Sequence, residues 1–278
     1  MSFDPILADI RFGCGRAPGI PAPDSVDAIL NGLRGPDDVA ERFPIPPFTD
    51  IMARMRAVRE HLPVRRKKRG TPEGDAARKA IRVINRHARE DYMRWMAAHI
   101  ARASHTRAPF RERLESFWAD HFTTAGKGGV LRRAVSPFRQ DAIRPHLAGR
   151  FEDMLLAAVR HPLMLHYLDQ LDSAGPNSVA NRRKGGRLGL NENLAREIIE
   201  LHTLGADAAY TQTDVRELAE LLTGLFFNID HGRVFRPGRA EPGPETVLGK
   251  TYGGDPARLD HVRAVLRDLA RHPDTARH

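Results

Sequence analysis

The sequence predicts a mainly α-helical fold, a multi-helix globular array with one small β-hairpin near residues 226–236. Of the 278 residues, 41% are hydrophobic and 28% are charged, which is typical of a globular chain and not of a disordered one. Aromatic residues make up only 6%, so Leu, Ile, Val and Ala must fill the core. Few runs of β-branched residues compete with helix formation, and apolar positions recur every three or four residues, as on one helix face.

Turn-forming residues divide the chain into its expected elements. Gly and Pro are frequent in residues 1–23, for which we expect an irregular N-terminal segment. The periodic stretches that follow predict helices at 25–33, 48–61, 71–104, 107–122, 137–146, 150–160, 162–170, 191–204, 212–225 and 256–271. Loops are expected at 65–70, 123–136 and 172–189, and a hairpin with its turn near Asp230 at 225–235. The predicted organisation is the segment 1–23, a helical core domain at 24–225, and a hairpin with a C-terminal helix at 226–278.

The charge of the chain allows two interpretations. The formal net charge is +9, and only six of the 44 basic residues are lysines. Arginine binds carboxylates and phosphates through two N–H groups at once, so an acidic partner is one interpretation. An arginine-rich genome is the other, because the basic residues are spread along the chain.

Several classes of protein are excluded by what the sequence lacks. Cys14 is the only cysteine, so neither an internal disulfide nor a cysteine-based zinc site can form. No signal peptide and no run of about 18 apolar residues occurs, so we expect a cytoplasmic protein without membrane contact. The motifs His-Glu-x-x-His, Gly-x-Ser-x-Gly and helix-opening Gly-x-Gly-x-x-Gly are also missing, which argues against metalloproteases, α/β-hydrolases and Rossmann folds.

The segment from Asn191 to His202 is the strongest functional signal. At 100° per residue, Asn193, Glu197 and Glu200 fall on one helix stripe that borders an apolar stripe. Two carboxylates at this spacing can serve as hard oxygen ligands or as an acid and a base. Salt bridges from both carboxylates to the abundant arginines are the structural alternative. His202 lies off this stripe and can join the carboxylates as a ligand only if the helix distorts.

Four more residues are candidates for the same site. His121 lies on an aromatic helix face, where it is either a core histidine or a metal ligand and proton carrier. Asp214 follows Thr211 at the spacing of a capping box and could add acidity. Arg187 ends a Gly-rich basic loop that suits an anion, and Arg196 is a further candidate binding residue.

These pieces of sequence resemble a known family. The matching stretches are Arg11-Phe12-Gly13-Cys14-Gly15, Phe117-Trp118-Ala119-Asp120-His121-Phe122, Met164-Leu165-His166-Tyr167-Leu168-Asp169 with Ser173, Leu190 to Gly205, Tyr210-Thr211-Gln212-Thr213-Asp214-Val215 and Leu222-Thr223-Gly224. Through them the chain resembles, from about residue 8 to its C-terminus, the bacterial domain-of-unknown-function family numbered eighteen hundred.

The resemblance implies no established activity. It implies relatives that are often exported and often encoded beside a sulfatase-like companion, which makes such a protein an expected partner. The chain differs from the family pattern in lacking a signal peptide and in having Leu194 where the family usually has Tyr. The family continues past a segment like 272–278, so we expect a version that is shortened at the C-terminus.

The sequence allows three functional hypotheses. The first is a hydrolase or oxidoreductase-like enzyme in which Glu197, Glu200 and His121 bind a divalent metal ion or act as acid and base on a polar or anionic substrate. The second is a non-catalytic binding or scaffold protein whose polar residues form a buried ion-pair network. The third is a polyanion binder that uses Arg65–Arg69 and Arg182–Arg187. Nucleic acid is not the expected partner, because few aromatic residues are present for stacking.

Overall fold

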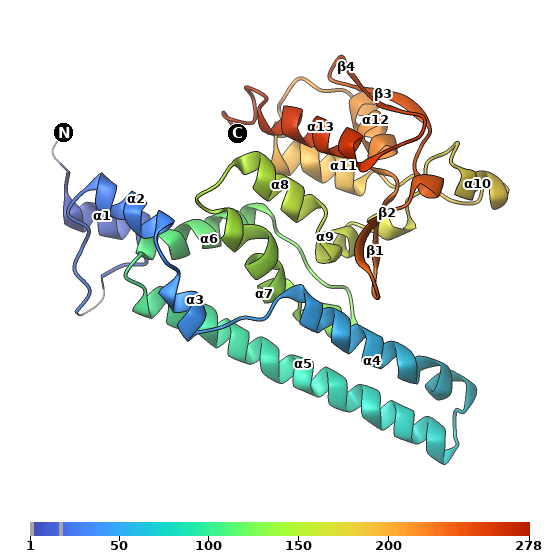
Figure 1. Cartoon of the computed structure of the whole chain (residues 1–278), viewed down its shortest axis with the longest axis horizontal. Coiled ribbons are helices and arrows are strands. Elements are labelled where there is room, and N and C mark those ends of the chain that lie inside the picture. The colour runs from blue at the N-terminus through green and yellow to red at the C-terminus, as the bar shows by residue number, and fades with distance from the viewer. Residues whose placement is uncertain (1–2, 17–18) are drawn as a thin grey trace. The chain divides into compact units, whose positions relative to one another are not determined.

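The computed structural model (Figure 1) describes residues 3–16 and 19–278, and at residues 233 and 234 it describes the backbone alone. Helices dominate the described residues, and four short strands form two separate antiparallel hairpins. This confirms the predicted mainly α-helical class with a small hairpin. Within the described residues, no helix is both long and apolar enough to cross a membrane.

The chain folds as two compact units, unit 1 with residues 1–150 and unit 2 with residues 151–278. The boundary between them lies inside the stretch 24–225, for which the sequence suggests a single helical domain. The division of the chain into a core domain at 24–225 and a C-terminal part at 226–278 stays a prediction.

In the described part of unit 1, all regular elements are helical. In chain order they are α1 (Pro5–Phe12), α2 (Val26–Arg34), α3 (Asp38–Arg42), α4 (Phe48–Lys67), α5 (Pro72–His105), α6 (Pro109–His121), η1 (Gly129–Arg133), α7 (Val135–Phe138), η2 (Arg139–Ile143) and η3 (Arg144–His146). Local capping explains several helix starts. The Ser25 hydroxyl accepts a hydrogen bond from the Ala28 N–H at 3.1 Å, and Thr71 caps α5, where Pro72 takes the first helical position.

Helix α1 corrects the prediction that residues 1–23 are irregular. The Asp4 carboxylate accepts hydrogen bonds from the N–H groups of Ile6 at 2.9 Å and Leu7 at 3.1 Å, and Pro5 takes the first helical position. The Pro and Gly content of the segment hid this short capped helix. Residues 1, 2, 17 and 18 of the predicted segment lie outside the described residues.

Helices α4 and α5 form a long antiparallel hairpin (Figure 1). The loop predicted at 65–70 is wrong for residues 65–67, because α4 continues through Pro63 to Lys67. The basic side chains in this last turn face the negative end of the helix dipole, which favours the longer helix. The turn is tight: a Cβ on Gly74 would lie 1.8 Å from the Lys68 carbonyl oxygen, so this position requires glycine.

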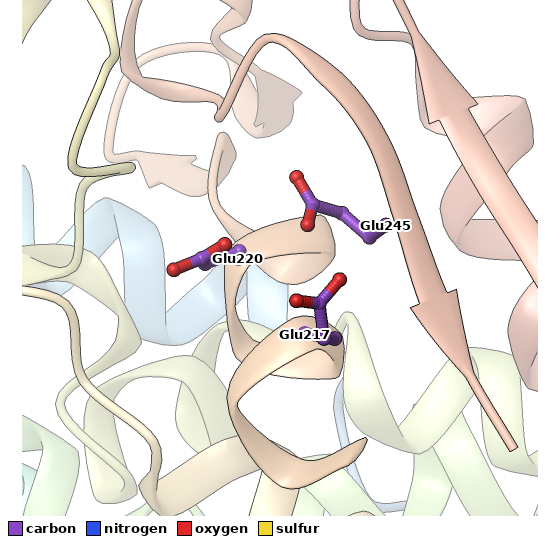
Figure 2. Close-up of side chains that lie close together, drawn as sticks. All are labelled: Glu217, Glu220 and Glu245. Atoms are coloured by element: carbon purple, nitrogen blue, oxygen red, sulfur yellow. The ribbon is translucent and has the colours of Figure 1, made fainter. Parts of the chain in front are cut away.

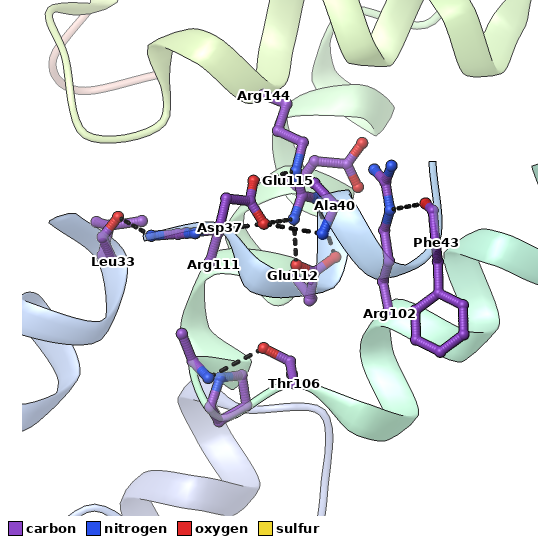
Figure 3. A network of polar contacts seen from close by, with 12 residues as sticks. Leu33, Asp37, Ala40, Phe43, Arg102, Thr106, Arg111, Glu112, Glu115 and Arg144 are labelled. Carbon is purple, nitrogen blue, oxygen red and sulfur yellow. Dashed lines mark hydrogen bonds and ion pairs between the residues drawn. The ribbon is translucent and has the colours of Figure 1, made fainter. Parts of the chain in front are cut away.

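A buried ion-pair network organises unit 1 (Figure 3). The Arg144 guanidinium donates to both carboxylate oxygens of Asp37, at 2.6 and 2.7 Å, and to both of Glu112, at 2.6 and 3.1 Å. Arg144 and Glu112 are 7% and 4% exposed. Arg111 donates to backbone carbonyls in the last turn of α2 and just after it, including that of Pro36 at 2.8 Å. Each buried charge thus has partners, which offsets the cost of removing it from water.

Unit 2 combines helices with both hairpins. Its elements are α8 (Phe151–Val159), α9 (Pro162–Tyr167), η4 (Gln170–Asp172), α10 (Val179–Arg183), α11 (Asn193–Glu197), η5 (Ile198–His202), α12 (Gln212–Leu222), β1 (Leu225–Asn228), β2 (Gly232–Phe235), η6 (Pro237–Arg239), β3 (Gly243–Val247), β4 (Lys250–Gly254) and α13 (Leu259–Ala270). Helix α13 packs into the core of unit 2 through one apolar face. On this face Val262, Val265 and Leu266 lie at helical spacing and are at most 1% exposed.

Two elements of unit 2 differ from the sequence prediction. The predicted hairpin is confirmed as β1–β2, in which Leu225 pairs with Phe235. The loop predicted at 172–189 contains the short helix α10, which Ser178 caps through the Asn181 N–H at 3.2 Å. The second hairpin, β3–β4, was not predicted, because its Gly-rich strands show no clear alternation of apolar and polar residues.

Candidate functional site

An asparagine stands two positions before the first residue of α11, within the predicted helix 191–204. The Asn191 side-chain oxygen accepts a hydrogen bond from the Asn193 N–H at 2.8 Å. Its amide nitrogen donates to the carbonyls of Leu168 and Asp169, at 3.3 Å each. Asn191 therefore connects the first residue of α11 to the end of α9.

The helix then changes its winding. Residues 193–197 are α-helical, but residues 198–202, the segment η5, form a π-helix. The spacing of 100° per residue therefore ends at Glu197, and the predicted single stripe does not continue unchanged to Glu200. Short π segments within helices are frequent at functional sites.

Arg196 links the carboxylates that flank it. Its guanidinium donates to Glu200 at 2.8 Å, to Glu192 at 3.5 Å and to the side-chain oxygen of Gln212 at 2.9 Å. The Gln212 amide in turn donates to Glu192 at 2.8 Å. The Tyr210 hydroxyl is hydrogen-bonded to Glu200, and burial together with this bond raises the pKa of the phenol. Glu200 is thus held in place from two sides.

Glu197 lies beside this network without joining it. The side chain is half-buried. Within the described residues, its carboxylate has no hydrogen bond or ion pair. Burial, and then the negative charge of Glu200, raise the pKa of Glu197 above its usual value. Glu197 and Glu200 therefore lie close enough for their charges to interact, but their surroundings differ, and the shared role that the sequence suggests stays a prediction.

The other predicted residues lie in different surroundings. His121 ends α6 in unit 1, half-buried between the rings of Trp118 and Phe122, with centroids 5.2 and 4.7 Å away. His202 is 2% exposed within η5. Asn193 is exposed at the start of α11, and Arg187 is exposed in the loop after α10. Their proposed roles stay predictions.

Asp214 has a structural role at the start of α12. One carboxylate oxygen accepts hydrogen bonds from the Thr211 N–H at 2.8 Å and the Thr211 hydroxyl at 2.6 Å, which completes the predicted capping box of α12. The other oxygen accepts from the Leu248 N–H at 2.7 Å. Burial opposes ionisation, but these hydrogen bonds outweigh it and lower the pKa of Asp214.

Unit 2 also contains a group of three carboxylates that the sequence pattern did not predict. Glu217 and Glu220 on α12 face Glu245 on β3 (Figure 2), and oxygen atoms of the three lie within 4.8 Å of one another. Burial, a hydrogen bond to Glu217 and the surrounding negative charges raise the pKa of Glu245 to about 8. The spacing of Glu217 and Glu220 was visible in the sequence, but Glu245 belongs to the hairpin that was not predicted.

The three carboxylates can share a proton or hold a cation, and the two states compete. With a pKa near 8, Glu245 carries a proton at neutral pH and can donate it to Glu217. A hard cation such as Mg²⁺ or Ca²⁺ suits an all-oxygen set but would have to displace that proton. Glu220 also accepts from Arg216 at 3.1 Å, which reduces its charge toward a cation.

Comparisons with known proteins give a family but no function. The family model described as a protein of unknown function, DUF1800, matches residues 18–278. No curated protein and no solved structure matches the chain. The match covers almost the whole chain, including both carboxylate groups described above, and it agrees with the resemblance seen in the motifs. The chain therefore belongs to the DUF1800 family.

Proposed function

We propose that unit 2 has a substrate site where α11 meets η5, and that Glu197 there transfers a proton to or from a polar substrate. Hydrolysis with Glu197 as the general base for water is the simplest such reaction. The observation that carries the proposal is the Glu197 carboxylate, which is half-buried, has a raised pKa and lacks a partner among the described residues.

The surroundings of Glu197 suit proton transfer. A general base works best when its pKa is closer to the working pH than that of an ordinary carboxylate, and burial moves Glu197 in this direction. Glu200 adds to the shift because Arg196 holds its charge close by. Because no group among the described residues hydrogen-bonds to the Glu197 carboxylate, this carboxylate can accept a hydrogen bond from a substrate or a water molecule.

The local charge favours a neutral or cationic substrate. Glu192 and Glu200 flank the single cation of Arg196, and Glu197 adds a third carboxylate close enough to feel the charge of Glu200. An anionic substrate would be repelled unless Arg187 reached it from its exposed loop. The divalent metal ion expected from the sequence stays a prediction, which elemental analysis of the purified protein tests directly.

The test combines a titration with a substrate screen. Carbon-13 NMR of the side-chain carboxyl groups should show Glu197 titrating above 4.5, the usual value for glutamate. In a screen of p-nitrophenyl esters, phosphates and glycosides, Glu197→Gln should lower any turnover by roughly 10²–10⁴-fold. Glu192→Gln changes another partner of Arg196, serves as the matched control and should keep most of the turnover. A normal pKa for Glu197, or full activity of Glu197→Gln, would refute the proposal.

A second candidate is a purely structural role for the same residues. The contacts of Arg196 with Glu192, Glu200 and Gln212 favour it, because they fix α11 against the start of α12. Under this alternative, Arg196→Gln should destabilise unit 2 clearly, and no substrate should depend on Glu197.

A further inference from the structure

The whole net positive charge of the chain lies in the helical hairpin of α4 and α5, residues 48–105, which we call the basic hairpin. It has 15 basic and 6 acidic residues and thus a net charge of +9. The rest of the chain has 29 of each sign and is neutral overall. The basic residues are therefore not spread evenly, as genomic bias alone would spread them.

Many cations of the basic hairpin have no internal partner. Seven of them are exposed and make no ion pair within the described residues: Arg65, Arg66, Lys67, Arg69, Lys79, Arg82 and Arg89. Two others have only long pairs, Arg78 with Asp75 at 3.7 Å and Arg86 with Glu90 at 3.9 Å. Exposed pairs of this kind contribute little and release their cation readily.

Four of these cations are regularly spaced along α5. Arg78, Arg82, Arg86 and Arg89 recur every three or four residues and so lie on one face of α5. At about 1.5 Å per residue this row is roughly 16 Å long. The block at 65–69 lies at the end of α4, just before the start of α5 at the tip of the basic hairpin, and adds further exposed cations there. A duplex has one negative charge per about 1.7 Å of its axis, so a straight basic row of this length can meet several phosphates.

We propose that the basic hairpin binds the phosphate backbone of double-stranded nucleic acid without sequence specificity. Single strands fit less well, because stacking needs exposed aromatic rings, whereas Phe48 and Trp95 are buried and Tyr92 is half-buried. An anionic membrane fits less well too, since membrane-surface helices bury a broad apolar face. At the basic tip only Leu62 and Val64 are exposed large hydrophobic residues among those described, at 38% and 36%. The exposed Met93, Met96 and Ile100 lie in the other half of α5, away from the block at 65–69.

The test is fluorescence anisotropy of the intact chain with a labelled 20-bp DNA duplex of random sequence. Binding should be measurable in 50 mM NaCl and fall about 10³-fold by 200 mM, as expected when roughly six phosphates are neutralised. A tip variant with four substitutions, Arg65→Gln, Arg66→Gln, Lys67→Gln and Arg69→Gln, should bind at least tenfold more weakly at 50 mM NaCl. The slope of log affinity against log salt should become less steep by about 3.6, since each of the four lost contacts removes roughly 0.9.

The control removes the same charge from the other basic segment. Its substitutions are Arg182→Gln, Arg183→Gln, Lys184→Gln and Arg187→Gln, and it should bind within threefold of the parent. Circular dichroism melting establishes that both variants fold. Equal losses in both variants, or no duplex binding by the parent at 50 mM NaCl, would overturn the proposal. So would equal competition by a 20-nt single strand, or binding only to vesicles of phosphatidylcholine with phosphatidylserine. None of these outcomes bears on Glu197, because the basic hairpin belongs to unit 1.

Discussion

The carboxyl group of Glu245 is hydrogen-bonded to the carboxylate of Glu217, a contact between two acids that requires a proton. Glu245 is only 6% exposed, and its pKa in the folded protein is about 8, against 4.5 for an ordinary glutamate. Folding therefore takes up a proton between these two pH values. The contribution of this contact to stability is complete below pH 4.5 and is lost as the pH rises toward 8.

The first prediction concerns this pH dependence. Glu245→Gln keeps a hydrogen-bond donor for Glu217 but cannot ionise. The melting temperature of the variant relative to the parent should therefore rise between pH 5 and pH 9, as measured by circular dichroism. Asp207→Asn, which changes an exposed acid in the same unit, is the control and should show no such trend. If millimolar Ca²⁺ or Mg²⁺ stabilises the parent but not Glu245→Gln at pH 8, the three carboxylates bind a cation instead.

The second prediction concerns the buried network of unit 1. Arg144→Met removes the partner of Glu112 and leaves a buried carboxylate without its cation. Breaking a buried pair in this way costs about 3–5 kcal/mol, which urea unfolding followed by circular dichroism can measure. Arg263→Gln breaks the exposed pair with Asp260 and should change the unfolding free energy little. If Arg144→Met lowers the unfolding free energy by less than about 1 kcal/mol, water reaches the network and the prediction is wrong.

Local signals explain what the sequence predicted well. Ser25 and Thr71 begin helices because their side chains satisfy N–H groups only a few residues away. The capping box of Thr211 and Asp214 is equally local. Glu197 and Glu200 are only three positions apart, so their charges interact even though the winding of the helix changes between them.

Long-range contacts explain what the sequence did not predict. The π winding of η5 depends on how Ile198 and Ile199, both fully buried, fit the core. The partner of Glu217 was hidden because Glu245 lies 28 positions later, on a strand whose sequence does not alternate. The basic block at 65–69 was visible in the sequence, but its extension by a row on α5 required the hairpin geometry.

The third prediction concerns Asp214. Asp214→Ala removes the half of the α12 capping box that accepts from Thr211, together with the acceptor for the Leu248 N–H, and should cost about 1–2 kcal/mol. Because its pKa is lowered from 3.8, the contribution of Asp214 is present above that pH and is lost as the pH falls below it. Asp214→Asn keeps one acceptor oxygen and should recover part of the loss in thermal melts at pH 7. Equal stability of the Ala variant and the parent would contradict this role.

The fourth prediction separates function from structure at Glu197. Its raised pKa means that the folded protein disfavours the ionised form, so Glu197→Gln should leave the melting temperature at pH 7 unchanged or raise it. Glu200→Gln instead weakens the contact with Arg196 and should be the less stable of the two variants. Residues kept for activity often cost stability, whereas residues kept for packing supply it. If thermal melts show the reverse order, Glu197 supports the fold, and the proton-transfer proposal loses the observation on which it rests.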